Sequence, residues 1–188
     1  MSLISVIFLN SNFLKYRFIS LLKYDFLAIK EFIFSNKKEI NVNKSIYLSL
    51  YYSGYQVFKE NFLFGVGNKN YRIVTCDKDK STLNRHFYCM THPHQIYFEL
   101  LSEHGLIGTI ILLVLFFTLI FKHIKIIINS RNHIQLGCLL YLLINFLPIL
   151  PSGSFFSDFN ITLFFINLSI MYAVNDKTNI FNEINRGR

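Results

Sequence analysis

The C-terminal half of the chain contains three apolar segments separated by short polar links. The first runs from Leu106 to Ile128, and none of its residues before Lys122 is charged. The second runs from Ile134 to about Leu150, and the third from Phe159 to Val174. About 20 apolar residues cross the hydrocarbon core of a bilayer as a helix. The pattern therefore predicts an all-α integral membrane protein with about three transmembrane helices, at 106–128, 134–150 and 159–174.

The basic residues around these segments predict their orientation. The C-terminal end of the first segment and the link after it hold Lys122, Lys125 and Arg131 and no acid, and the tail 175–188 holds three basic residues against two acidic ones. Because cytoplasmic loops carry an excess of Lys and Arg, we expect both regions on the cytoplasmic side. Residues 35–105 then form a long, helical periplasmic loop.

The N-terminal residues 1–34 give a weaker pattern. Ser2–Leu9 is apolar but too short to cross a membrane, and it lacks the cleavage site of a signal peptide. Charged residues interrupt the aromatic stretch Tyr16–Phe34. We favour an interfacial amphipathic helix there over a span. The alternative is that residues 2–9 end a span that begins upstream, in a longer protein.

Composition supports the membrane assignment. The 188 residues are 52% hydrophobic and 16% charged, with a formal net charge of +8, whereas soluble domains carry about 25% charged residues. The 21 Phe and 11 Tyr exclude a disordered chain. The basic residues flank apolar segments, which explains the positive charge without nucleic acid.

Within the expected periplasmic loop, the sequence predicts a helix over 47–64 that ends in a Gly-Val-Gly turn. Gly65 and Gly67 allow a close backbone approach, and Lys69 and Arg72 follow within five residues of the turn. Arg presents a planar fork that matches phosphate oxygens. Two interpretations remain open: a solvated loop attracted to anionic lipid head groups, or a binding site for an anionic substrate.

The cysteines allow one crosslink. Cys76 and Cys89 have twelve residues between them, and in an oxidising compartment they could close a disulfide; the alternative is two unpaired thiols. Zinc binding by this pair and His92 is conceivable, but the spacing matches no zinc pattern. Cys138 lies inside an apolar segment, where we expect a small buried residue.

A histidine precedes the first apolar segment. Pro93 suits the first position of a helix, which would place His94 in the first turn, on one face with Gly105 and Gly108 and opposite Glu99 and Glu103. A helix N-terminus disfavours the imidazolium and attracts anions, so we expect a neutral His94 able to accept a proton beside an anion. The alternative is that His92 and His94 only cap a helix at the membrane surface.

These residues carry a family resemblance. His94-Gln95, nine residues, then Gly105-Leu106-Ile107-Gly108-Thr109 resembles the signature of the O-antigen ligase family. The stretch Phe58–Gly67 also resembles the region before the site in that superfamily, which includes O-antigen polymerases and protein O-oligosaccharyltransferases. The resemblance extends through Pro151–Phe156 and covers roughly 47–174.

The resemblance implies a glycosyltransferase of the bacterial inner membrane that works on the periplasmic face without nucleotide, metal or other cofactor. Its donor would be a glycan on undecaprenyl pyrophosphate, and its acceptor the lipid A–core of lipopolysaccharide. His94 would be the catalytic base that activates the acceptor hydroxyl. The candidates for binding pyrophosphate or glycan are Arg72, Lys69, Gln95 and Arg85.

Two further interpretations accompany this one. The same motif fits an O-antigen polymerase, whose acceptor is another lipid-linked repeat. Family members usually have ten to twelve spans, so a chain with about three looks like the C-terminal part of a larger polytopic glycosyltransferase. It could act with an upstream membrane subunit, or be a non-catalytic module that binds lipid-linked glycan.

Overall fold

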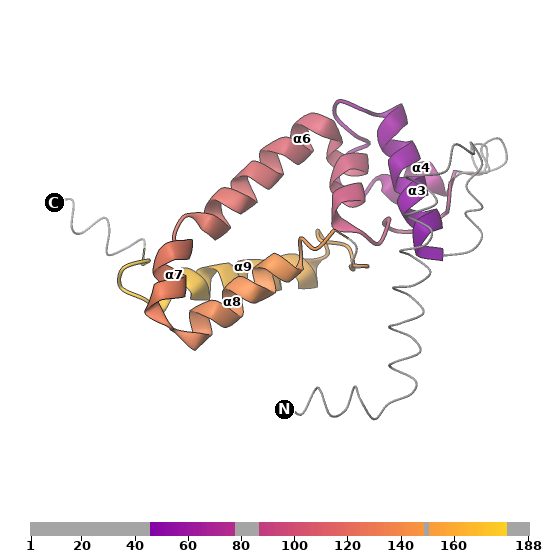
Figure 1. Ribbon diagram of the computed structural model, residues 1–188. Coiled ribbons are helices and arrows are strands. Elements are labelled where there is room, and N and C mark those ends of the chain that lie inside the picture. Colours follow the sequence, from indigo (N-terminus) through magenta and orange to yellow (C-terminus); the bar gives the residue numbers. More distant parts are fainter. Residues whose placement is uncertain (1–45, 78–86, 149–150, 180–188) are drawn as a thin grey trace, which may run out of the picture. The chain divides into compact units, whose positions relative to one another are not determined.

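The computed structural model describes residues 46–77, 87–148 and 151–179, and every regular element in these ranges is a helix (Figure 1). The prediction of an all-α chain is confirmed for this part. The segment 1–34 and Arg85 lie outside the described residues. The chain divides into two compact units, residues 1–50 and 51–188. Of the first unit the structure describes residues 46–50, which begin helix α3, Ile46–Glu60.

The helix before the glycine turn is shorter than its pattern predicts. Helix α3 spans Ile46–Glu60, and residues 61–64 form a turn rather than a further helical turn. Asn61 closes the helix, since its backbone N–H bonds to the carbonyls of both Val57 and Phe58 at 3.1 Å. The short helix α4, Tyr71–Thr75, follows the glycines. The prediction of a helix over 47–64 was therefore too long by four residues at its C-terminal end, because the backbone of the turn bonds to another helix.

The central element is α6, Ile96–Phe121, which bends at Gly105. Gly105 has φ 64° and ψ −170°, and it separates a nine-residue first arm, 96–104, from an apolar second arm, 106–121. The bend is visible in Figure 1 as a change of direction within α6. Helix α7, Ile124–Ser130, continues the chain after a break at Lys122 and His123.

By length and composition, one helical stretch of the described residues, Ile96–Ser130, could cross a membrane. Helices α8, His133–Ile144, and α9, Asp158–Ala173, are apolar but shorter. The predicted segment 134–150 therefore contains a helix that ends six residues early, ahead of Pro148. Many side chains on these helices remain exposed although they are large and apolar, among them Ile111, Val114, Phe159 and Phe165.

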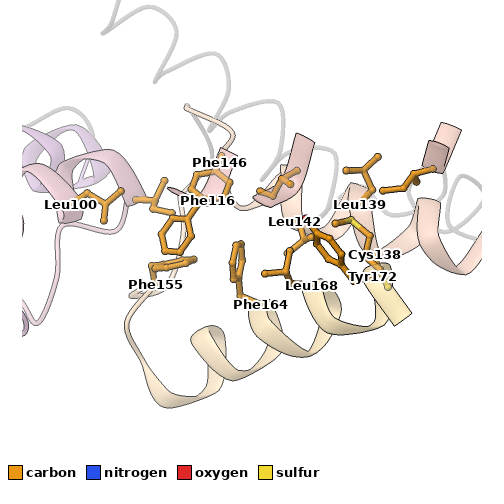
Figure 2. Close-up of a cluster of buried hydrophobic side chains, with 14 residues drawn as sticks. Leu100, Phe116, Cys138, Leu139, Leu142, Phe146, Phe155, Phe164, Leu168 and Tyr172 are labelled. Atoms are coloured by element: carbon orange, nitrogen blue, oxygen red, sulfur yellow. The ribbon is translucent and has the colours of Figure 1, made fainter. Parts of the chain in front are cut away.

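A shared aromatic cluster joins the second arm of α6 to α8 and α9 (Figure 2). Phe116 of α6 makes edge-on contacts with Phe155 and Phe164, with ring centroids 5.4 and 5.3 Å apart. Edge-to-face geometry of this kind contributes about 0.5–1.5 kcal/mol per pair beyond the buried area. Phe155 belongs to the loop between α8 and α9, so the cluster fixes that loop as well as the helices.

Buried polar contacts fix the other end of these helices. Gln135 of α8 is fully buried, and its Nε2 donates to the carbonyl of Met171 at 2.7 Å and to Thr178 Oγ1 at 3.0 Å. The Tyr172 hydroxyl donates to the carbonyl of Leu119 at 2.6 Å. Since buried polar groups are costly unless bonded, these contacts determine how α6, α8 and α9 pair.

Candidate active site

The bend in α6 creates a backbone junction with the turn that follows α3. A helix that breaks loses intrahelical partners for N–H groups on one side of the break and for carbonyls on the other. Four hydrogen bonds replace them: Leu106 N to Phe62 O (2.8 Å), Ile107 N to Leu63 O (3.3 Å), Val66 N to Ser102 O (3.0 Å) and Gly67 N to Glu103 O (2.8 Å). The two stretches that resemble the family motif thus bond directly to each other.

Two glycines meet at this junction because the backbones leave no room for a side chain. A Cβ on Gly105 would lie 2.5 Å from Gly65 N, and a Cβ on Gly65 would lie 2.6 Å from Gly105 N. Both residues have positive φ, 67° at Gly65 and 64° at Gly105, which favours glycine. At Gly108, one turn later, a Cβ would lie 2.8 Å from the Cβ of His104. Gly65 and Gly105 thus allow two backbones to pack closely, whereas Gly108 leaves room for the side chain of His104.

Glu103, beside the bend, holds the loop that precedes α4. Its side chain is 2% exposed. Burial raises its pKa to about 7, and the nearby Glu99 adds to the rise, whereas backbone N–H groups of Lys69 and Tyr71 and the charge of Lys69 oppose it. Its Oε2 is buried and has no hydrogen-bond partner among the described residues. Glu103 is thus a buried carboxyl that can change protonation near neutral pH.

Glu103→Gln should remove a pH dependence of stability. The folded-state pKa of about 7 lies above the ordinary value of 4.5, so the folded protein keeps this proton where the unfolded chain releases it. Stability from this group is therefore complete below about pH 4.5 and lost as the pH rises through 7. We expect Glu103→Gln to match wild type at pH 5 and to be more stable at pH 8, by up to about 3 kcal/mol.

Thermal unfolding in detergent at the two pH values would measure this difference. Glu60→Gln, at an exposed position at the end of α3, is the matched control and should show no change. A difference between wild type and Glu103→Gln that stays constant from pH 5 to pH 8 would contradict the assignment of the titration to Glu103.

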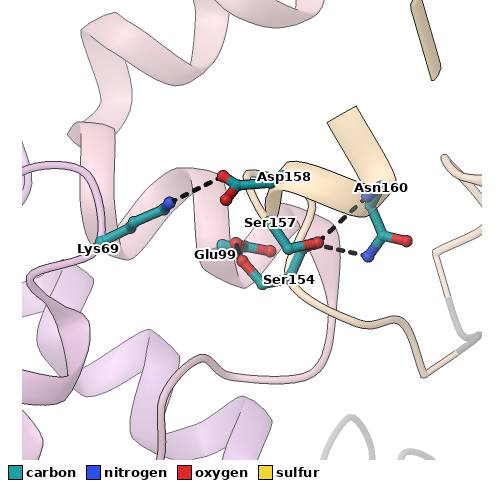
Figure 3. Close-up of polar contacts among 6 residues, drawn as sticks. All are labelled: Lys69, Glu99, Ser154, Ser157, Asp158 and Asn160. Atoms are coloured by element: carbon teal, nitrogen blue, oxygen red, sulfur yellow. Dashed lines mark hydrogen bonds and ion pairs between the residues drawn. The ribbon is translucent and has the colours of Figure 1, made fainter. Parts of the chain in front are cut away.

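Glu99, one helical turn earlier, holds a different loop (Figure 3). It is 1% exposed, and its two oxygens bond to Ser154 Oγ at 2.5 Å and to Phe155 N at 2.9 Å. Burial raises its pKa, and these bonds oppose the rise. Lys69, on the loop before α4, makes an ion pair at 3.5 Å with Asp158, the first residue of α9. The first arm of α6 thus uses two buried glutamates to fix two loops.

His94 does not lie in the first helical turn, so that prediction was wrong. Helix α6 begins at Ile96 with Gln95 as its N-cap. His94 precedes the cap and adopts a left-handed conformation with φ 57°. A helix starting at Pro93 would have left the N-cap without a capping side chain, whereas Gln95 Oε1 accepts from Phe98 N at 3.0 Å. His94 therefore does not share a helix face with the two glycines, contrary to the prediction. It also lies outside the first helical turn, which was the reason for expecting a neutral imidazole.

Contacts on both sides fix the backbone of His94. Its carbonyl accepts from Ser152 N at 2.9 Å. Gln95 is buried, and its Nε2 donates to the carbonyl of Pro148 at 2.9 Å. Both ends of the Gln95 amide are thus used within the chain. The arrangement places His94 at the end of the first arm, against the loop between α8 and α9.

His92 forms a pair with His94. Their ring centroids lie 4.0 Å apart, and His92 Nδ1 lies 2.9 Å from the Thr91 hydroxyl. Burial lowers the pKa of His92 to about 4, and the charge of His94 adds to this, so His92 is neutral at neutral pH. His92 Nε2 and Ser152 Oγ are buried. A hydrogen bond between the His92 ring and the backbone of Ser152 opposes the fall in pKa, so His92 is held against the same loop as His94.

The basic candidates lie on the loop and on α4. Lys69 has φ 61° and is exposed, and it makes the ion pair to Asp158 described above. Arg72 is exposed on α4. A disulfide links Cys76, the C-cap of α4, to Cys89, and Thr75 Oγ1 bonds to the carbonyl of Met90 at 3.4 Å. The helix of Arg72 is thus attached to the segment that leads into His92.

Four residues of this site were not predicted as functional from the sequence. Glu99 and Glu103 were expected to face away from it, and His92 and Ser152 were given no role in it. Two carboxylates one turn apart beside an apolar helix, and a second histidine two residues before His94, are the signals that point to them. Ser152 gives no such signal, because only the packing of the loop brings it to His94.

Comparison with known proteins gives one match. The family model described as O-antigen ligase matches residues 1–113, which includes the glycine turn, His94 and the bend of α6. Neither the curated proteins nor the solved structures gave a match to this chain.

Proposed function

Because this chain belongs to the O-antigen ligase family, we propose that it transfers a glycan from undecaprenyl pyrophosphate to a hydroxyl group of lipid A–core. His94 accepts the proton of the acceptor hydroxyl as its oxygen attacks the anomeric carbon of the donor glycan. A bond forms between that oxygen and the anomeric carbon, and the bond from the anomeric carbon to the pyrophosphate breaks. A positioned general base of this kind contributes about 10²–10⁴-fold to a rate.

The observation that supports this proposal is the conformation of His94. A non-glycine residue with positive φ is strained, and such strain persists where the surrounding structure holds it, often at active sites. Here Ser152 and Gln95 hold it on either side, and the neutral imidazole of His92 lies against its ring. The backbone of His94 is thus held on both sides, and its imidazole packs against a second, neutral imidazole.

The membrane placement is part of the proposal. The family is membrane-associated, and Ile96–Ser130 is long and apolar enough to cross a bilayer. The apolar second arm of α6 lies directly after the bend, so His94 at the far end of the first arm would sit above the membrane surface. With the links after α6 and α9 in the cytoplasm, that surface is the periplasmic one.

Arg72 is our candidate for binding the pyrophosphate. It is exposed on a helix attached to the segment before His92. Arg72→Ala should raise the KM for the donor by about tenfold or more, because a hydrogen bond to a charged group contributes about 1.5–3 kcal/mol. Arg72→Lys should raise it less, since the charge remains but not the fork.

Initial rates at a series of donor concentrations would measure both variants, with Lys59→Ala, at an exposed position on α3, as the control. An unchanged KM in both Arg72 variants would exclude Arg72 from the donor site.

Complementation tests the function as a whole. The chain would be expressed in a bacterium that lacks its own O-antigen ligase, and glycan attached to lipid A–core would be scored. We expect attachment by wild type. Longer glycans in a strain that lacks its polymerase, without attachment in the first strain, would replace the ligase proposal by a polymerase. No product in either strain, at confirmed membrane levels, would contradict transfer by this chain.

A further inference from the structure

We infer that Glu99 is a positioning residue for His94, which it fixes through the loop 151–156. The inference deepens the proposed function and depends on it, because the residue that is positioned is the proposed base. Two steps connect Glu99 to His94: Glu99 determines the path of the loop, and the loop determines the backbone of His94.

The first step rests on the burial of a carboxylate. Glu99 is 1% exposed, and a buried carboxylate is costly unless hydrogen bonds compensate. Ser154 Oγ and Phe155 N, both in the loop, supply these bonds, and Figure 3 shows Ser154 beside Glu99. On its other side the loop is held by Asn160 Nδ2, which donates to the carbonyl of Ser154 at 2.8 Å. Ser154 is thus fixed between α6 and α9.

The second step is the bond from the loop to His94. Ser152, two residues before Ser154, donates its backbone N–H to the carbonyl of His94 at 2.9 Å. The left-handed conformation of His94 costs about 1–2 kcal/mol for a residue with a side chain. It therefore depends on such contacts. If Ser152 moves, the carbonyl of His94 loses its partner and the residue can relax to an ordinary conformation.

The aromatic cluster makes this role separable from folding. Phe155 is 3% exposed and packs against Phe116 and Phe164, so the loop stays attached to the helices without Glu99. Glu99 instead fixes the backbone at Ser154 and Phe155, two and three residues after Ser152. Its loss should misplace His94 and leave the helical packing in place.

Kinetics of glycan transfer by the full chain in membranes test the inference. Glu99→Gln presents one acceptor oxygen where the loop offers two donors, and Ser154→Ala removes one of those donors. We expect kcat to fall about 10–100-fold in each variant, with the KM for the donor within about twofold of wild type, as for a displaced general base. Glu60→Gln is the matched control and should keep the wild-type kcat.

A second readout needs no activity. The rate at which diethyl pyrocarbonate modifies His94, followed by peptide mass spectrometry, should rise several-fold in Glu99→Gln and Ser154→Ala. Modification of exposed His133 and of buried His123 should not change. A rise at His123 as well would mean general unfolding and would overturn the inference, as would unchanged modification of His94 or an unchanged kcat.

The two readouts separate the inference from the function on which it depends. If wild type transfers no glycan, the proposed function fails and the modification rate alone decides whether Glu99 holds His94. If wild type transfers glycan and both readouts change together, Glu99 acts through His94.

Discussion

His94→Ala should reduce glycan transfer by about 10²–10⁴-fold, the contribution of a positioned general base. The loss should appear in kcat, with the KM for the donor little changed, because the imidazole acts on the acceptor hydroxyl. Folding should be little changed, since the His94 side chain forms no part of the aromatic cluster and Ala keeps the Cβ at this left-handed position. The rate of glycan transfer would be measured in membrane vesicles that contain matched amounts of protein, a fluorescent donor and lipid A–core.

His133→Ala is the matched control, because it removes an exposed histidine from the first turn of α8. It should leave the transfer rate at the wild-type level. If His94→Ala kept more than about a tenth of the wild-type kcat, the loss would be too small for a missing general base. Another residue would then have to be the base.

Gly105→Ala should destabilise the fold by at least about 3 kcal/mol and abolish transfer. At φ 64° and ψ −170° the backbone of Gly105 lies in a region that is essentially restricted to glycine. Its added Cβ would also collide with the backbone of Leu63 and Gly65. The junction would have to open, and with it the four hydrogen bonds that pair the turn 62–67 with the bend.

The control for this variant is Gly137→Ala in α8, where a Cβ would meet nothing within 4 Å. It should be neutral, or stabilising by up to about 1 kcal/mol, since Ala is the better helix former. Thermal unfolding in detergent and the transfer rate would compare the two. Equal unfolding temperatures for Gly105→Ala and Gly137→Ala would mean that the junction is not needed for the fold.

The sequence predicts the helices well, because their signal is local. Runs of apolar residues at 106–121 and 159–173 allow few structures other than helices, and the structure has α6 and α9 there. It also marks Gly65 and Gly105 as special, although not as partners. The two glycines are forty residues apart in the sequence, and their pairing depends on the close approach of two backbones in space. A local pattern of residues does not show which distant segments come together.

The site was predicted less well, because the sequence pattern did not identify the residue that caps α6. Pro93 is a good first residue of a helix, but Gln95 supplies the capping oxygen, so α6 starts at Ile96, three residues later. That shift alone moves His94 out of the helix. Glu99 and Glu103 were assigned to the opposite face, as charged residues of an amphipathic helix usually are. They are instead buried, because two loops bring backbone N–H groups to them.

The release of undecaprenyl pyrophosphate tests the central claim most directly. The purified chain would be reconstituted in lipid vesicles with a glycan-loaded undecaprenyl pyrophosphate donor and lipid A–core, and the freed lipid pyrophosphate would be quantified. We predict release that requires the acceptor and that is lost in His94→Ala. Two results would contradict the account. One is a wild-type protein that shows a cooperative unfolding transition and yet leaves the donor intact. The other is release of equal amounts of lipid pyrophosphate by wild type and His94→Ala.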